Sequence, residues 1–276
     1  MEPAGISKRL DLGHVTLHYL DYGGQGPCDL VLVHGGGANA HWFDWVGPLF
    51  AQYCRVLALD LRGHGDSGEA EPPVYTYDAY IEDIHALVAA ENLKTPVLLG
   101  HSMGGMLVVK YTGTWPREVR ALIVCDVIDV YTKEFVRRLR KIGRRIGREY
   151  ATLDDYIAHF RIVPYGVRGP RETHEVIART AGRQLANGRW VHKFDRRVYS
   201  QREEIDTLPF WRRITCPTLL MRTEDGQRPI QAMKEACPQL ESLDLLEAGH
   251  HLVIDEPERT VALAVEFLRR HGLLEE

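Results

Sequence analysis

Short continuous apolar runs alternate along this chain with longer segments in which apolar residues recur every three or four positions. A continuous apolar run is typical of a strand buried on both faces of a parallel sheet, and the longer period is typical of a helix packed on that sheet. The repetition therefore predicts an α/β fold, a mostly parallel sheet with helices on both faces. The predicted central strands are residues 30–33, 56–59, 97–99, 121–125 and 218–221, and helical spacing covers residues 77–88 and 261–268.

The two ends of the pattern differ from its middle. Residues 15–20 alternate apolar and polar side chains ahead of Asp21-Tyr22-Gly23-Gly24, which predicts an antiparallel strand at the edge of the sheet. Residues 243–246 form a last apolar run, and Pro257 then opens the final helix.

The alternation breaks between residues 127 and 209, where helical patterns occur without a convincing buried strand. We therefore predict a core formed by residues 1–126 and 210–276, and a helical cap, or lid, formed by residues 127–209, which we call the insertion. Its first helix has an apolar stripe with a period of 3.6 residues, at Phe135, Leu139, Ile142 and Ile146.

Charge is distributed unevenly, although the whole chain has a formal net charge of only -4. Residues 131–171 contain 11 lysines and arginines against 4 acidic residues. This basic segment is either a solvated helix face or an electrostatic funnel that attracts anionic substrates. A nucleic-acid partner is excluded, because a single basic helix without interleaved aromatic residues is a poor footprint for one.

Composition narrows the class of protein further. The 276 residues are 45% apolar, which suits one large globular unit that needs no metal or disulfide for stability. The cysteines number five and include no Cys-x-x-Cys pair, which argues against a disulfide framework and suits a reducing compartment. The first residues lack the apolar core of a signal peptide, and no run has the length of a membrane span. We expect a cytoplasmic protein without a membrane partner.

The strongest chemical signal is Gly100-His101-Ser102-Met103-Gly104, which follows a predicted strand and precedes a helical pattern. A serine on so sharp a strand-to-helix turn is lifted above the sheet, and the two glycines remove side chains that would collide there. The turn leaves the Met103 amide at a helix N-terminus, where it can stabilise a developing negative charge. This pattern predicts Ser102 as a nucleophile.

A second glycine-rich segment, His34-Gly35-Gly36-Gly37, follows the strand at residues 30–33. Glycines there let the backbone approach a ligand closely, so the Gly36 amide is a candidate second donor to an oxyanion. A phosphate-binding loop is the rival interpretation. It fails because neither Lys-Ser nor Lys-Thr follows.

The order of four segments, residues 34–37, 60–67, 100–104 and 248–251, resembles that of the α/β-hydrolase superfamily over nearly the whole chain. The resemblance implies an eight-stranded, mostly parallel sheet, a Ser–acid–His triad and a cap at the place of the insertion. It also implies that His250, the first histidine after Ala248-Gly249, is the base that accepts the serine proton. A fold of this kind hosts many chemistries, so it gives no substrate.

The acid of the triad has two candidates. Most of the superfamily places it after the penultimate strand in a Gly-x-x-Asp pattern, but here Thr223-Glu224-Asp225-Gly226 departs from that pattern. Asp225 stands one position before the aspartate of that pattern. Asp126, at the end of the strand at residues 121–125, resembles a minority arrangement and is the candidate we prefer; Glu224 and Asp129 stand behind these two. Either carboxylate would orient the imidazole and stabilise the imidazolium.

These residues support three hypotheses of function. The first is a serine hydrolase that cleaves a small carboxylic ester or lactone through an acyl-enzyme on Ser102. The second keeps the triad but breaks a carbon–carbon or amide bond of a carboxylate-bearing substrate, with Arg137, Arg144, Arg161 or Arg168 as anion partners. The third is a ligand receptor on the same fold with slow or no turnover.

The expected partner is a small molecule, and the oligomeric state cannot be derived from the sequence. Four aromatic residues are candidates for substrate binding: Trp42, Phe43, Tyr165 and Trp190. No motif implies an organic cofactor or a metal.

Overall fold

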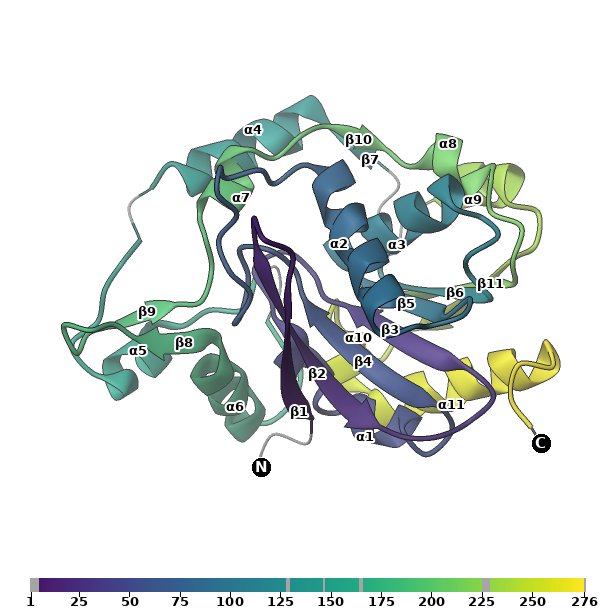
Figure 1. The fold of residues 1–276 in the computed structure, drawn as a ribbon, viewed down its shortest axis with the longest axis horizontal. Coiled ribbons are helices and arrows are strands. Elements are labelled where there is room, and N and C mark those ends of the chain that lie inside the picture. The colour runs from purple at the N-terminus through teal and green to yellow at the C-terminus, as the bar shows by residue number, and fades with distance from the viewer. Residues whose placement is uncertain (1–4, 128–129, 146, 164–165, 225–228, 276) are drawn as a thin grey trace.

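The computed structural model describes residues 5–127, 130–145, 147–163, 166–224 and 229–275. One eight-stranded sheet runs through the centre of the molecule (Figure 1). Its neighbouring strands are parallel, except that the second strand in spatial order is antiparallel to the first and to the third. In spatial order its strands are β1 (Ile6–Asp11), β2 (Thr16–Gly23), β4 (Arg55–Asp60), β3 (Asp29–Val33), β5 (Val97–His101), β6 (Ala121–Cys125), β11 (Thr218–Thr223) and β12 (Leu240–Leu245). The predicted α/β class and mostly parallel sheet are confirmed.

Helices cover both faces of this sheet, each over its own hydrophobic core (Figure 1). On one face lie α2 (Tyr77–Ala90), α3 (Met103–Thr114), α8 (Leu208–Trp211) and α9 (Gln231–Ala236). On the other lie the 3-10 helix η1 (Ala40–Phe43), α1 (Gly47–Phe50), α10 (Leu252–Asp255) and α11 (Pro257–Arg270). Central strands such as β5 and β6 are buried along their whole length because both faces are covered.

The prediction that residues 15–20 form the edge of the sheet is wrong. β2 contains residues 16–20 of this segment, but β1 pairs with it in antiparallel register, Ile6 opposite Asp21, and takes the edge position. β1 exposes alternate side chains and carries Lys8 and Arg9 in its middle. Charged residues protect an open sheet edge from pairing with further strands. Because they interrupt the apolar pattern, apolar runs in the sequence do not indicate such a strand.

The insertion connects β6 to the last part of the core in two groups of elements (Figure 1). The first group contains β7 (Val130–Tyr131), α4 (Lys133–Gly143), α7 (Arg197–Ser200) and β10 (Ile205–Asp206). The second contains α5 (Leu153–His159), α6 (Arg171–Ala181), β8 (Gly182–Gln184) and β9 (Trp190–His192). β7 pairs with β10 and β8 with β9, and neither small sheet was expected. That this insertion is a cap remains a prediction.

Helix α4 forms where its pattern predicts, but it is rotated relative to the apolar stripe. Val136 and Gly143 are its buried residues and Leu139 of the stripe packs partly buried on the core, whereas Phe135 and Ile142 of the stripe are 39% and 40% exposed. Ile146 lies outside the described residues. A Cβ atom on Gly143 would come within 2.3 Å of the Ser200 nitrogen, so α4 meets the end of α7 at its glycine. Close backbone packing, rather than the largest side chains, therefore sets the buried face.

Two further features bear on the sequence analysis. All five cysteines are buried and free. None of the helices in the described ranges combines the length and the apolar character that crossing a membrane requires.

Candidate active site

Ser102 stands between β5 and α3, on the turn that the sequence predicts. Its backbone has φ 54° and ψ -118°, a conformation that side chains other than glycine rarely adopt. The turn is held by the Ser102 amide, which donates 2.9 Å to the Cys125 carbonyl of the adjacent strand. Such strain, kept in place by surrounding structure, is typical of functional positions.

The glycines on either side of Ser102 are required by space. A Cβ atom at Gly100 would lie 2.3 Å from the Gly104 carbonyl oxygen, and one at Gly104 would lie 2.1 Å from the Val33 carbonyl oxygen. Both contacts are with backbone, which cannot move aside as a flexible side chain can. The strand-to-helix turn therefore tolerates only glycine at these two positions.

His250 joins Ser102 to Asp126 across more than half of the chain. Its Nε2 atom lies 3.0 Å from Ser102 Oγ, and its Nδ1 atom lies 2.5 Å from Asp126 Oδ2. An acid acceptor at Nδ1 assigns the proton to that nitrogen, so Nε2 has the lone pair that faces the serine hydroxyl. The three side chains form one connected hydrogen-bonded chain of hydroxyl, imidazole and carboxylate.

Asp126 is held from both sides at the end of β6. Its amide donates 2.8 Å to the Met221 carbonyl, and its Oδ1 atom accepts a hydrogen bond of 3.0 Å from the Thr223 amide. The residue has φ 48° and is 4% exposed. Its carboxylate is therefore fixed with one oxygen on the backbone and the other on His250.

The other acid candidates lie elsewhere. Asp225 and Asp129 fall outside the described residues. Glu224 is exposed and pairs with Arg168 at 3.1 Å. Among the described carboxylates, the one that the structure brings to His250 Nδ1 is that of Asp126.

The loop of residues 34–37 lies against the serine. A Cβ atom at Gly35 would lie 3.1 Å from Ser102 Cβ, and one at Gly36 would lie 3.6 Å from Met103 Sδ. His34 fixes this loop: its Nδ1 donates 2.7 Å to the Gly35 carbonyl, and its Nε2 accepts 3.1 Å from the Leu61 amide. Burial lowers the pKa of His34, which favours the neutral ring that this bonding needs.

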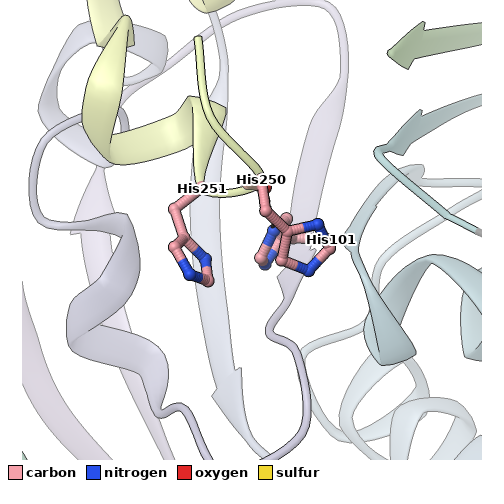
Figure 2. Close-up of side chains that lie close together, drawn as sticks. All are labelled: His101, His250 and His251. Atoms are coloured by element: carbon pink, nitrogen blue, oxygen red, sulfur yellow. Dashed lines mark hydrogen bonds between the residues drawn. The ribbon is translucent and has the colours of Figure 1, made fainter. Parts of the chain in front are cut away.

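Two neighbouring histidines lie against the His250 ring. His101 Nε2 donates 2.8 Å to the His250 carbonyl, and Figure 2 shows these two rings side by side. His251 is 2% exposed and meets the Trp42 ring edge-on, with centroids 4.9 Å apart. Burial, together with His250 and His251, lowers the pKa of His101 well below its ordinary value.

Two clusters of side chains have the composition of a metal site. In the first, ring nitrogens of His101, His250 and His251 lie within 4.8 Å of one another. Both nitrogens of His250 already contact Ser102 and Asp126, so this cluster is better explained by the serine site. In the second cluster, Asp60 already accepts hydrogen bonds from His18 and from the Ala40 and Asp66 amides, which explains its burial.

The predicted substrate-binding aromatics have different positions. Phe43 is fully buried and Trp42 is 6% exposed, both in the core beneath η1. Trp190 is half-buried in β9, and Tyr165 lies outside the described residues. Their role in substrate binding stays a prediction, and complete burial leaves Phe43 no surface to offer a substrate.

The proposed anion partners Arg137, Arg144, Arg161 and Arg168 are all exposed. Arg168 binds the Glu247 carbonyl and Glu224 at the surface. Two residues that the sequence analysis missed contact the loop of residues 34–37: His192, whose Nε2 donates 3.3 Å to the Gly37 carbonyl, and Tyr199, whose hydroxyl lies against Gly36 and Gly37. No spacing or motif distinguishes them, because they reach the loop through the folding of the insertion.

Comparisons with known proteins agree with this architecture. The sequence profile described as "Alpha/beta hydrolase family" matches residues 30–263. N-formylmaleamate deformylase of Pseudomonas putida is 28% identical, over 92% of this chain and 93% of that protein. 2-hydroxy-6-oxo-6-(2'-aminophenyl)hexa-2,4-dienoic acid hydrolase of Metapseudomonas resinovorans is 24% identical, over 98% and 93%. The crystal structure of E-2-(acetamidomethylene)succinate hydrolase superposes with a TM-score of 0.83 at 22% identity, covering 96% of this chain and 99% of that one.

Proposed function

The chain belongs to the alpha/beta hydrolase family and is a hydrolase, and from this premise we propose that it works through an acyl-enzyme on Ser102. The observation that carries the proposal is the pair of contacts made by His250, 3.0 Å to Ser102 Oγ and 2.5 Å to Asp126 Oδ2. A serine hydroxyl becomes a useful nucleophile when a neighbouring imidazole accepts its proton. The two contacts of His250 support this role for its imidazole and an orienting role for the Asp126 carboxylate.

In the first half of the reaction Ser102 Oγ attacks the substrate carbonyl carbon while His250 Nε2 takes the hydroxyl proton. Asp126 keeps the ring in place and stabilises the imidazolium, while its own carboxylate stays ionised. The carbonyl oxygen becomes an oxyanion, for which the amides of Gly36 and Met103 are the proposed donors. The leaving group then takes the proton from His250 as its bond to the acyl carbon breaks.

In the second half a water molecule gives a proton to His250 Nε2 and attacks the acyl carbon. The ester bond to Ser102 Oγ breaks, the serine recovers its proton, and the acid product leaves. The Met103 amide suits its role because it belongs to the first turn of α3, where N–H groups have no intrahelical acceptor. A developing negative charge at this helix end is stabilised by the aligned peptide dipoles.

The first candidate substrate is a small carboxylic ester or lactone. The second is an amide or carbon–carbon bond in a molecule that also bears a carboxylate. The relatives favour the second candidate, because one is named for N-formylmaleamate and another for a hexa-2,4-dienoic acid. Both names describe carboxylic acids.

The proposal is tested by treating the whole protein with a serine-directed fluorophosphonate and mapping the adduct by mass spectrometry. We expect one adduct, on Ser102, and none on the Ser102→Ala variant. A label at another residue, or no label, overturns the proposal. A panel of p-nitrophenyl esters, lactones, amides and diketones then separates the two substrate candidates, and ligand binding without any turnover contradicts both and favours a receptor.

A further inference from the structure

Two arginines are buried among the described residues, and they differ in one respect. Arg62 is 3% exposed and donates 2.6 Å from both Nε and Nη2 to the two carboxylate oxygens of Asp83. Arg202 is 2% exposed, yet its Nε and Nη1 atoms make no hydrogen bond within the described part of the chain. An arginine stays charged at every physiological pH. Burying a charge without a partner anion costs folding free energy, so the burial of Arg202 has to serve another purpose.

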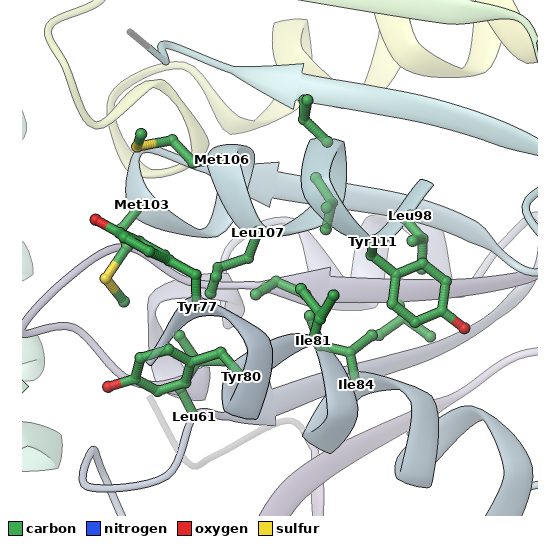
Figure 3. Close-up of a cluster of buried hydrophobic side chains, with 14 of the residues drawn as sticks. Leu61, Tyr77, Tyr80, Ile81, Ile84, Leu98, Met103, Met106, Leu107 and Tyr111 are labelled. Carbon is green, nitrogen blue, oxygen red and sulfur yellow. The ribbon is translucent and has the colours of Figure 1, made fainter. Parts of the chain in front are cut away.

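The surroundings of Arg202 are aromatic rather than acidic. Its guanidinium carbon lies 5.6 Å from the centre of the Tyr77 ring and 5.8 Å from that of Tyr199. Tyr77 belongs to the same buried cluster as Met103, the residue after the serine (Figure 3). Aromatic faces stabilise a cation but carry no net negative charge. The rings around Arg202 therefore stabilise its charge without supplying a carboxylate partner among the described residues.

Tyr199 connects this charge to the proposed oxyanion loop. A Cβ atom at Gly37 would lie 3.1 Å from the Tyr199 hydroxyl oxygen, and one at Gly36 would lie 3.5 Å from it. No described residue forms a hydrogen bond with this hydroxyl. The hydroxyl is therefore an available donor against the loop where the substrate carbonyl is proposed to bind, and the Arg202 guanidinium carbon lies 5.8 Å from the centre of the same ring.

We propose that Tyr199 and Arg202 form a subsite for a carboxylate group of the substrate, in which the Tyr199 hydroxyl donates a hydrogen bond to the carboxylate and Arg202 supplies the compensating charge. The inference deepens the proposed function and rests on it, because it places the second anionic group beside the acyl group that Ser102 would attack. A hydrogen bond to an ionised acceptor is shorter and stronger than one to a neutral group. The exposed arginines of α4 are not needed for it.

The direct test compares two substrates that differ in one charge: mono-p-nitrophenyl succinate, which has a free carboxylate, and its methyl ester. We expect the wild-type protein to favour the free acid at least tenfold in kcat/KM, mainly through KM. Tyr199→Phe and Arg202→Gln should each reduce that preference at least fivefold, and Arg202→Lys should reduce it less. Arg138→Gln removes an exposed positive charge of the insertion and should leave the preference as it is.

A binding measurement tests the subsite without turnover. It is needed where a buried substitution damages folding, or where the enzyme does not cleave these esters. Succinate should raise the melting temperature of the Ser102→Ala protein, and the shift should fall at least by half when Tyr199→Phe is added. Equal preference for acid and methyl ester in the wild type, or the same preference in Arg202→Gln and wild type, overturns the subsite. Failure of fluorophosphonate to label Ser102 overturns the proposed function instead, and the succinate shift then still tests the subsite alone.

Discussion

His101 holds the loop of the proposed base: its Nε2 atom donates a hydrogen bond of 2.8 Å to the main-chain carbonyl of His250. His101 also ends β5, so it directly precedes Ser102. One side chain thus connects the strand that ends beside Ser102 to the loop that carries His250. Because burial lowers its pKa, the ring stays neutral and keeps a single proton for this bond.

Replacing His101 should therefore slow the reaction without removing a reacting group. We expect His101→Leu to lower kcat by about 10- to 100-fold, since small displacements of a positioned base have effects of this size. The measurement is kcat on a p-nitrophenyl ester, with fluorophosphonate labelling of Ser102 slowed in parallel. His85→Gln, at a half-exposed histidine on α2, is the control. Unchanged kcat in His101→Leu contradicts the positioning role.

The choice between the two acid candidates can be made by amide substitutions. Asp126→Asn keeps the shape of the side chain but turns the imidazole toward the wrong tautomer, so kcat should fall by about 10⁴-fold. Asp225→Asn should change kcat less than threefold. Steady-state kinetics of the two variants, with circular dichroism to confirm folding, decide the matter, and the reverse order of effects would assign the role to Asp225.

The turn around Ser102 should not accept a methyl group. In Gly104→Ala the new Cβ atom would lie 2.1 Å from the Val33 carbonyl oxygen, so either the turn or the sheet must move. We expect at least a 100-fold loss of kcat/KM or loss of folded protein on expression, because displacement of the turn misplaces the nucleophile. Gly147→Ala is the matched control, since its Cβ atom would meet nothing closer than 3.7 Å. Equal activity of the two variants would contradict this reading.

Low pH should weaken the contact between the insertion and the loop of residues 34–37. Burial lowers the pKa of His192 to about 4, while its ring holds the Gly37 carbonyl and the Tyr156 hydroxyl. An unfolded chain has an ordinary histidine with a pKa of about 6.5, so between these values the unfolded state binds more protons. The free energy of unfolding then falls as the pH drops from about 6.5 to about 4, by up to about 3 kcal/mol from this residue.

Urea unfolding of the wild type and His192→Asn across that pH range measures the effect. The difference in unfolding free energy between the two proteins should shrink as the pH falls, because the variant has lost the titrating ring. A difference that stays constant from pH 6.5 to pH 4 would show that this histidine is not the group involved.

The core of the fold could be predicted because its central strands are buried on both faces. β6 is apolar at every position and β5 is apolar from Val97 to Leu99, so both stand out from the sequence alone. β1 could not be predicted in the same way, since an exposed edge strand has charged residues where a central one has apolar ones. The buried face of α4 could not be predicted from the sequence either, because it depends on the contact of Gly143 with Ser200, which is distant along the chain.

The candidate site could be predicted in part for a related reason. Ser102 lies in a local motif, whereas the acid could not be chosen, because Asp126 and Asp225 both follow carboxyl ends of adjacent parallel strands. The side-chain direction that brings Asp126 to His250 comes from its backbone and from the Thr223 amide. Tyr199 and Arg202 were not predicted, because the many basic residues of α4 pointed to its own arginines, which are exposed.

The central claim, that His250 activates Ser102, is tested most directly by the rate at which a fluorophosphonate modifies Ser102 in wild type and in His250→Gln. The variant keeps a polar side chain of similar size but lacks a group that can accept the hydroxyl proton. We expect the second-order rate constant for modification to fall at least 1,000-fold, on the order of a lost general base. Modification of Ser102 at the wild-type rate in folded His250→Gln would contradict the account.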